Sequence, residues 1–543
     1  MFAHMAAALV VLSGLTDGPV TGGSGGLADL GPVELGHAGH NCIPPEQREQ
    51  AEAMIAEYYR LHGPVLPVEP LGYSSRATAL YDFWPQAGVR GGDLVLANYV
   101  DLNPAGGATE VRDPECTAYT YDGHLGHDCI VRSFSEQLIG VPVFAIKPGT
   151  VVARQDGYFD MQTAWTNTPA NFVILDHGNN HRTYYWHLKN GSVAVTQGQT
   201  VAAGQQLGLT ASSGYSSWPH LHLEIYKNGL VNEPFTGACH VAPSGWAAPE
   251  AIDRTLRVSE FAFSRIAPNT VQPPPHRRPS TGQLALNDPV HWFWAQIQNV
   301  PTASNFRVRY YRPDGGLSYD SGTLPFNNPR TYQAMNPYWT WNIAEMHTIP
   351  GTWRMELDIN GVLLVNAPVE VSETVDPAFN RPPAALQGLS FEPASPSADD
   401  AIFCRVATSL VHDDPDYEVV KYEYVWTVDG VEVRRITSAA HSDAIRAGLA
   451  GLGAEVRCTV TPKDALLSAP ASTATVTVGC GTPDFNGDGD FGTDQDIEAF
   501  FACLSGSCCP ACFAGGADFN RDGDVGTDQD IESFFRVLAG GSC

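Results

Sequence analysis

Short alternations of hydrophobic and polar residues recur along most of the chain and predict β-strands. Residues 171–175 (NFVIL) and 182–187 (RTYYWH) are rich in β-branched and aromatic side chains, a composition typical of strands. Residues 306–311 and 353–359 show the same pattern, and the Asn-Gly pair at 360–361 favours a hairpin turn after the second of them. These segments predict a mostly β, multidomain protein built from antiparallel sheets.

A helical pattern interrupts this trend near the N-terminus. Between Pro44 and Leu61 the apolar and aromatic residues fall on one side of a helix, at Ala51, Met54, Ile55, Tyr58 and Tyr59. Pro45 suits the first turn of a helix. Residues 15–40 are rich in glycine and poor in apolar side chains, which is typical of a linker. We assign residues 21–119 to a linker and an N-terminal flank or pro-region.

The length of the chain predicts several domains, and its cysteine content predicts a location outside the cytoplasm. A chain of 543 residues is too long for a single core. Residues 6–14 (AAALVVLSG) have the length of a signal-peptide apolar core, so we expect an export signal over residues 1–20. We expect no transmembrane helix, because no stretch is long and apolar enough to form one. Twelve cysteines favour an oxidising, extracytoplasmic compartment.

The formal charge narrows the classes of partner. The chain carries 59 acidic and 31 basic residues, for a net charge of −28. Binding to nucleic acid requires clustered Lys and Arg side chains that neutralise phosphates. The charge balance therefore argues against nucleic acid as a partner.

Two histidine motifs carry the candidate chemistry. His124 and Asp128 lie in HLGHD, and His220 and His222 lie in PHLHLE at residues 219–224. A catalytic zinc ion usually takes three ligands from His, Asp, Glu or Cys and leaves one position for water. Side chains on a strand repeat with a period of two, so His220 and His222 point to the same side of a sheet. One of them can bind a metal while the other faces a substrate.

Together with the segment 175–188 between them, these motifs resemble those of the lysostaphin-type zinc metallopeptidases, endopeptidases that act mainly on peptidoglycan. The resemblance implies an antiparallel β-sheet fold, the duplicated hybrid motif, which we expect over residues 120–255. It also implies the functional residues, with zinc ligands His124, Asp128 and His222 and catalytic histidines His187 and His220.

The same resemblance implies a mechanism. Zinc would lower the pKa of a bound water and polarise the scissile carbonyl group. His187 and His220 would orient or deprotonate that water and stabilise the developing oxyanion. The substrate implied is a peptide bond in peptidoglycan.

Neighbouring residues have simpler interpretations. His177 and His181 lie in the turn-rich sequence DHGNNH, and we expect both to be solvated. Cys129 follows Asp128 directly, and its thiolate could bind zinc. A cysteine in an exported chain is more often half of a disulfide, here with Cys116 or Cys239.

The second half of the chain is predicted to contain β-modules. Residues 280–372 are expected to form a β-sandwich. Residues 383–480 contain Cys404, Trp426 and Cys458 in an order that resembles an immunoglobulin-like sandwich, in which a Trp packs against an inter-sheet disulfide. This resemblance implies a bond between Cys404 and Cys458. A spacer or adhesion module is the expected role.

An internal repeat occupies residues 481–543. The sequence DFNGDGDFGTDQDIE at 484–498 recurs as DFNRDGDVGTDQDIE at 518–532. Oxygen-bearing side chains at positions one, three and five, with Gly at six, match the first half of an EF-hand loop. The pair resembles a dockerin-type calcium repeat, and the alternative is a disordered acidic tail. The expected calcium ligands are Asp484, Asn486, Asp488, Asp490 and Asp496 in the first copy and Asp518, Asn520, Asp522, Asp524 and Asp530 in the second.

Together these features predict an exported zinc metalloendopeptidase whose expected substrate is peptidoglycan. The predicted calcium-binding module could bind a surface or scaffold partner. Two alternatives stay open. One is a zinc peptidase that acts on extracellular proteins. The other is a non-catalytic protein that binds the cell wall or mediates adhesion.

Overall fold

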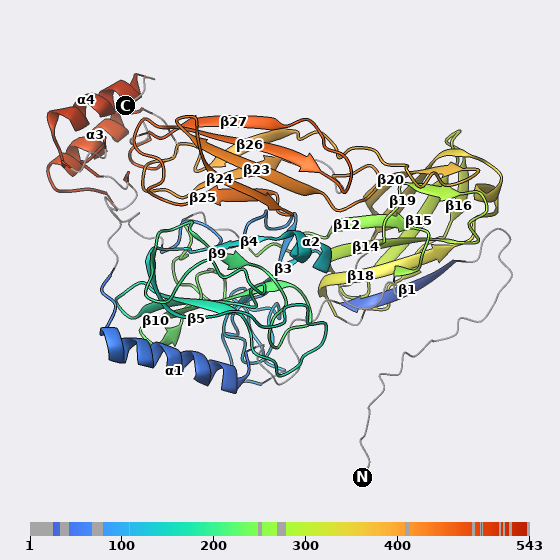
Figure 1. The fold of residues 1–543 in the computed structure, drawn as a ribbon, viewed down its shortest axis with the longest axis horizontal. Helices are drawn as coiled ribbons and strands as arrows, with labels where there is room; N and C mark the ends of the chain where they lie inside the picture. The colour runs from blue at the N-terminus through green and yellow to red at the C-terminus, as the bar shows by residue number, and fades with distance from the viewer. Residues whose placement is uncertain are drawn as a thin grey trace, which may run out of the picture.

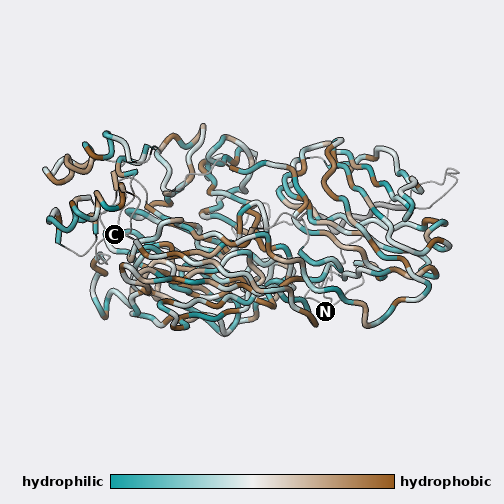
Figure 2. Tube along the Cα trace, turned by 90° about the horizontal axis from the view of Figure 1, so that it is seen from above, coloured by the Kyte–Doolittle hydropathy of each residue, from teal (hydrophilic) through white to brown (hydrophobic). Residues whose placement is uncertain are grey.

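The computed structural model describes residues 25–32, 43–67, 80–107, 109–247, 252–268, 279–328, 330–407, 413–479, 484–488, 490, 492–509, 512–513, 516–520 and 524–539. Strands in mainly antiparallel sheets dominate these residues, so the prediction of a mostly β chain is confirmed. Figure 2 shows hydrophobic and hydrophilic positions interspersed along the coloured part of the chain. The predicted export signal at 1–20 lies outside the described residues.

An eight-stranded sheet carries the histidine motifs, and we call residues 80–247 the eight-stranded region. Its helix α2 (Phe134–Ile139) follows β3, and β4 (Pro142–Phe144) pairs with β9 (Gln206–Leu209) in a separate small sheet. The strands of the large sheet run antiparallel to their neighbours. Their order across the sheet is β2 (Leu94–Asn98), β3 (His127–Val131), β10 (His220–Lys227), β7 (His181–Trp186), β6 (Phe172–Asp176), β5 (Gly149–Gln155) and β8 (Thr200–Val201), with β11 (Leu230–Val231) beside β10.

Helix α1 (Pro45–His62) lies against one face of this sheet (Figure 1). Its buried residues Ala51, Ile55 and Tyr58 join an apolar cluster with Phe172 of β6 and Trp186 of β7. The helical periodicity in the sequence therefore reflects real packing, and the helix is an integral layer on the sheet.

The sandwich region, which comprises residues 257–372 and strand β1 (Gly25–Pro32), consists of two sheets around one core. The 3-10 helix η2 (Ala344–His347) follows β18. One sheet has the order β1 (Gly25–Pro32), β18 (Tyr332–Trp341), β14 (His291–Val300) and β12 (Arg257–Ser264). The other has the order β13 (Gln283–Ala285), β20 (Val362–Ser372), β19 (Gly351–Ile359), β15 (Asn305–Tyr311) and β16 (Leu317–Asp320), with β17 (Leu324–Pro325) beside β15.

Two strands of the sandwich region come from outside the predicted limits of 280–372. Strand β12 precedes those limits, and β1 pairs antiparallel with β18 from a stretch that was predicted to be a linker. The linker prediction fails for residues 25–32 because the free edge of a sheet offers backbone donors and acceptors to any extended segment. Figure 1 shows β1 at the edge of the sheet beside β18.

The two-sheet region, residues 388–479, has a buried Trp426 at its centre. Its three-stranded sheet has the order β21 (Gly388–Glu392), β22 (Ile402–Ala407) and β25 (Ser442–Ile445). Its four-stranded sheet has the order β24 (Val431–Ser438), β23 (Lys421–Val428), β26 (Glu455–Lys463) and β27 (Ser472–Thr477).

The predicted bond between Cys404 and Cys458 is wrong in this structure. Both side chains are buried in the same cluster as Trp426, and both are free thiols. Burial and a hydrogen bond with Cys404 raise the pKa of Cys458 far above its ordinary value. The order Cys, Trp, Cys thus predicted which side chains meet, but meeting in an apolar core does not by itself form a bond.

The two-sheet region shares its core with the eight-stranded region. Phe403 packs against Phe83 and Phe144, with ring centroids 4.8 and 5.7 Å apart, in one apolar cluster that includes both regions. The backbone N–H of Ala439 donates to Gly140 O at 2.9 Å. The two-sheet region is therefore packed onto its neighbour and is not an independent spacer (Figure 1).

Candidate metal centre

The histidine motifs meet at adjacent strands of the eight-stranded sheet. Asp128 on β3 lies directly opposite His222 on β10 in the antiparallel register. His124 precedes β3 in a turn, and its backbone N–H donates to Tyr121 O at 3.1 Å. His187 follows the end of β7, which is the other neighbour of β10. The fold thus brings together side chains that lie about a hundred positions apart in the sequence.

Three of these side chains form a group that could hold a metal ion. His124, Asp128 and His222 are fully buried, and their ligand atoms lie within 4.8 Å of one another. The distance from His124 Nε2 to His222 Nδ1 is 3.2 Å, and Asp128 lies 3.2 Å from the first ring and 2.7 Å from the second. Tetrahedral zinc with bonds of 2.0–2.1 Å separates its ligand atoms by about 3.3 Å. The two separations of 3.2 Å lie close to this value, whereas the 2.7 Å separation is shorter; the donor set of two imidazole rings and one carboxylate fits zinc.

The hydrogen bonds of the two rings also favour a cation between them. His124 Nδ1 lies 2.7 Å from Tyr99 O, and His222 Nε2 lies 2.9 Å from Glu224 Oε1. Both partners accept, so these nitrogens carry the protons when the rings are neutral. The remaining nitrogens, His124 Nε2 and His222 Nδ1, then direct lone pairs at the same point as the Asp128 carboxylate. A cation at that point removes the repulsion.

The two remaining histidines flank this group. His187 and His220 are fully buried, with ring centroids 4.5 Å apart. His187 Nδ1 lies 2.6 Å from Ser213 O and His220 Nδ1 lies 2.8 Å from Trp218 O, so in both rings Nε2 carries the lone pair. His220 Nε2 is 3.7 Å from Asp128 Oδ1.

The backbone at His187 is unusual. Its φ is +64°, a left-handed conformation that is uncommon for residues other than glycine. Its carbonyl oxygen accepts from Ala211 N at 3.0 Å, which helps to hold this conformation. Such positions concentrate at functional sites, where the surrounding structure stabilises them.

Further residues around the group were not predicted from the sequence. Glu224 lies at the end of the second motif, and Arg48 lies on α1, far away in the chain. Asn98 on β2 donates from Nδ2 to Asp128 Oδ2 at 3.1 Å. Burial alone would raise the pKa of Asp128, but the rings of His124 and His222, when they are protonated and no cation lies between them, outweigh burial and hold that pKa well below its usual range. Glu224 could have been predicted, because it lies two residues after His222 on the same predicted strand and so shares its face. No local sequence pattern indicates Arg48 or Asn98.

The histidines expected to be solvated are buried. His177 Nε2 is 2.9 Å from Thr183 Oγ1, and His181 Nε2 is 2.7 Å from the Tyr81 hydroxyl. Burial lowers the pKa of His177 to about 4 and that of His181 to about 2. The prediction failed because the Asp-His-Gly-Asn turn folds back onto the sheet and onto Tyr81, a contact distant in sequence.

Of the three cysteines that were considered near the group, two form a disulfide and one is a free thiol. Cys116 and Cys239 form a disulfide, and Cys129 is buried and unbonded. Neither pairing considered for Cys129 occurs, because its two candidate partners bond to each other. Burial raises the pKa of the Cys129 thiol, which opposes the thiolate form needed for zinc binding.

The repeated acidic segments adopt matching local structures. Each precedes a helix, α3 (Asp494–Leu504) or α4 (Asp528–Leu538), and the two helices pack around Phe500 and Phe534. Asp496 and Asp530, expected to close the calcium loops, accept hydrogen bonds from Thr493 N and Thr527 N in capping boxes. Both also accept from the loop, at Asn486 N and Asn520 N. Of the ten expected ligands, Asp522 lies outside the described residues. The structure describes the other nine, which are Asp484, Asn486, Asp488, Asp490, Asp496, Asp518, Asn520, Asp524 and Asp530.

Disulfides also occur beside these helices. Cys503 bonds to Cys508, and Cys509 bonds to Cys512. Among the described residues, no helix combines the length and apolar character needed to cross a bilayer.

Comparison with known proteins supports the resemblance for the eight-stranded region. Residues 134–234 match Peptidase family M23. The chain is 35% identical to lysostaphin of Staphylococcus simulans over 209 residues, which are 34% of this chain and 40% of that protein. It is 34% identical to the peptidoglycan DD-endopeptidase ShyA of Vibrio cholerae over 91 residues, 17% of this chain and 19% of that protein.

A solved structure gives a similar match. The catalytic domain of the antimicrobial peptidase lysostaphin from Staphylococcus simulans is 28% identical and covers 23% of this chain and 84% of that domain, with a TM-score of 0.16. That score is too low to compare the two folds. The chain spans less than half the length of either relative above. His187, His220 and His222 therefore lie in a region similar to peptidases of family M23, whereas His124 and Asp128 precede the matched residues.

Proposed function

We propose that the protein is a zinc metalloendopeptidase that hydrolyses peptide bonds in peptidoglycan cross-links. The observation that carries the proposal is the convergence of His124, Asp128 and His222 with two further histidines in one buried site. Two neutral rings and a carboxylate are a donor set that suits catalytic zinc. The match of residues 134–234 to a peptidase family supports the same chemistry.

Each residue has a role in this proposal. When bound, zinc lowers the pKa of water and polarises a carbonyl group. His187 and His220 have their Nδ1 atoms bonded to carbonyl oxygens, so Nε2 is the atom that accepts a proton from the attacking water or stabilises the oxyanion. The five side chains are fully buried, so a peptide reaches them only when a neighbouring segment moves.

The substrate and the setting rest on the relatives. Lysostaphin is described as an antimicrobial peptidase, and ShyA is named as a peptidoglycan DD-endopeptidase. We extend this to peptidoglycan as substrate and to action outside the cytoplasm. Cleavage of a protein substrate without cleavage of peptidoglycan would favour a protease of extracellular proteins. Zinc binding without any hydrolysis would favour a wall-binding or adhesion protein.

The C-terminal repeat is proposed to bind calcium and a surface or scaffold partner. Its support is the strict duplication and the matched loop-to-helix hydrogen bonds in both copies. Calcium should make the ellipticity at 222 nm more negative as α3 and α4 are stabilised, measured by titration with circular dichroism. No change at millimolar calcium would refute this part.

The two-sheet region is proposed to be immunoglobulin-like, because its buried Trp lies between two sheets.

The test of the main proposal is the release of new amino groups from purified peptidoglycan by the full chain loaded with zinc. The full chain is needed because Phe403 belongs to the core of the eight-stranded region. His187→Ala and a chelator should each abolish release, and His62→Ala, at an exposed histidine of α1, should leave it unchanged. Folded, zinc-loaded protein that releases nothing would contradict the proposal.

A further inference from the structure

An arginine of helix α1 is joined to the candidate metal centre. Arg48 Nη1 donates to Glu224 Oε2 at 2.8 Å, and Nη2 donates to Glu224 Oε1 at 2.6 Å. This is the planar, two-bond geometry that arginine forms with carboxylates and lysine cannot. Glu224 is fully buried, whereas the Arg48 side chain is 22% exposed. The two residues are 176 positions apart, so the contact depends on how α1 packs.

The ion pair continues to a metal-binding ring. Glu224 Oε1, which accepts from Arg48, is also 2.9 Å from His222 Nε2. His222, Glu224 and Tyr226 alternate along β10 and share one face of the sheet, and the Tyr226 hydroxyl is 3.2 Å from Arg48 Nη1. Helix α1 lies on that face. Consecutive hydrogen bonds therefore connect Arg48 on the helix, through Glu224, to the ring of His222 that carries the proposed metal-binding atom Nδ1.

Each residue in this series of hydrogen bonds sets the orientation of the next one. A buried carboxylate without a partner would rotate away towards another donor. The two bonds from Arg48 fix the plane of the Glu224 carboxylate. Glu224 then holds the proton of His222 on Nε2 and sets the rotation of the ring, which leaves Nδ1 directed at His124 and Asp128.

We propose that Arg48 is a positioning residue of the metal centre, acting through Glu224 on His222, and that α1 is part of the mature site and not a removable pro-region. This inference rests on the proposed zinc site, and deepens it. It predicts that zinc affinity depends on a helix outside residues 134–234, the stretch that matches the peptidase family.

The experiment compares zinc affinity in full-length variants. We expect Arg48→Met to weaken zinc binding by about 10–100-fold, as loss of an outer-shell partner does elsewhere, measured by competition with a chromogenic chelator. Arg60→Met is the matched control, because Arg60 pairs with Glu57 on the exposed side of the same helix. The absorption spectrum of the cobalt-substituted protein should change in Arg48→Met and not in Arg60→Met. Arg48→Lys should recover part of the affinity.

A double-mutant cycle separates positioning from general support of the fold. If Arg48 acts through Glu224, Arg48→Met should add nothing to the loss already caused by Glu224→Gln. Fully additive losses would overturn the inference, as would wild-type zinc affinity and an unchanged cobalt spectrum in Arg48→Met. Arg48→Gln takes its place in these measurements if Arg48→Met does not fold. Failure of the wild-type chain to bind zinc is a different result, which would refute the proposed function itself.

Discussion

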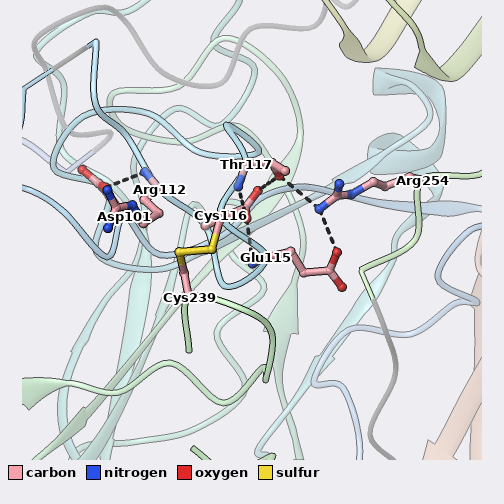
Figure 3. The surroundings of a disulfide bond; sticks show 8 residues. Asp101, Arg112, Glu115, Cys116, Thr117, Cys239 and Arg254 are labelled. Carbon is pink, nitrogen blue, oxygen red and sulfur yellow. Dashed lines mark hydrogen bonds and ion pairs between the residues drawn. A yellow bond between two sulfur atoms is a disulfide. The ribbon is translucent and has the colours of Figure 1, made fainter. Parts of the chain in front are cut away.

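Replacing Cys116 and Cys239 by serine removes a bond whose loop contains the three candidate metal ligands and the two further histidines of the site. The two residues are 123 positions apart, and the five functional side chains lie between them in the sequence. Figure 3 shows the bond beside Glu115 and Thr117, which both contact Arg254, at 2.9 and 3.1 Å. These contacts remain in the variant, so the local fold should persist while the denatured chain gains freedom.

The expected loss follows from the size of the loop. In the chain-entropy description, closing a loop of 123 residues stabilises the folded state by about 5 kcal/mol at 25 °C. Native disulfides that are removed typically cost about 2–5 kcal/mol. With a urea m-value of about 2 kcal/mol/M, the unfolding midpoint should fall by about 1–2.5 M.

The assay is equilibrium urea unfolding followed by tryptophan fluorescence, with zinc affinity measured on the folded variant. Cys503→Ser with Cys508→Ser is the matched control. Its loop separation is only 5, and it lies in the C-terminal repeat, so the eight-stranded region should unfold at the wild-type midpoint. An unchanged midpoint for the Cys116 and Cys239 variant would refute the reasoning. Equal losses in both variants would refute the assignment of the effect to this loop.

Three further predictions concern catalysis, pH and the shared core. His187→Ala should retain zinc and lower kcat by about 10²–10⁴-fold, measured as amino groups released; loss of zinc would show that His187 is a ligand. Burial would lower the pKa of His441, but Asp93 and Asp413 outweigh it and raise that pKa above its ordinary 6.5. The charged ring therefore stabilises the folded state fully below pH 6.5, and this stabilisation is lost as the pH rises through the raised pKa. In His441→Gln the urea midpoint should depend less on pH over this range. Phe403→Ala should cost about 3–5 kcal/mol and increase hydrogen exchange in β4; unchanged exchange in β4 would contradict a shared core.

The sequence predicted the site better than its surroundings. The two histidine motifs predicted the group through their resemblance to a known peptidase family, and the structure brings His124, Asp128 and His222 together. Arg48 could not be predicted, because its contact depends on the packing of α1 onto β10. The burial of His181 depends on Tyr81, one hundred positions away.

The fold shows the same limit. Alternating patterns predicted most sheets, because a sheet with one buried face requires alternation. Strand β1 escaped prediction, since an edge strand held by backbone hydrogen bonds needs no hydrophobic pattern. Cys404 and Cys458 were correctly brought together by the pattern around Trp426, but their covalent state was not encoded in it.

The packing of Phe403 into the neighbouring region affects how the candidate site would approach peptidoglycan, the proposed substrate. A catalytic domain on a flexible tether can rotate freely and meet a surface at any angle. Here the backbone contact between Ala439 and Gly140 and the common core remove a hinge between the two regions. The site must then be presented to its substrate by rotation of both regions as one rigid body, so the shape of the two-sheet region limits which surfaces the histidines can reach.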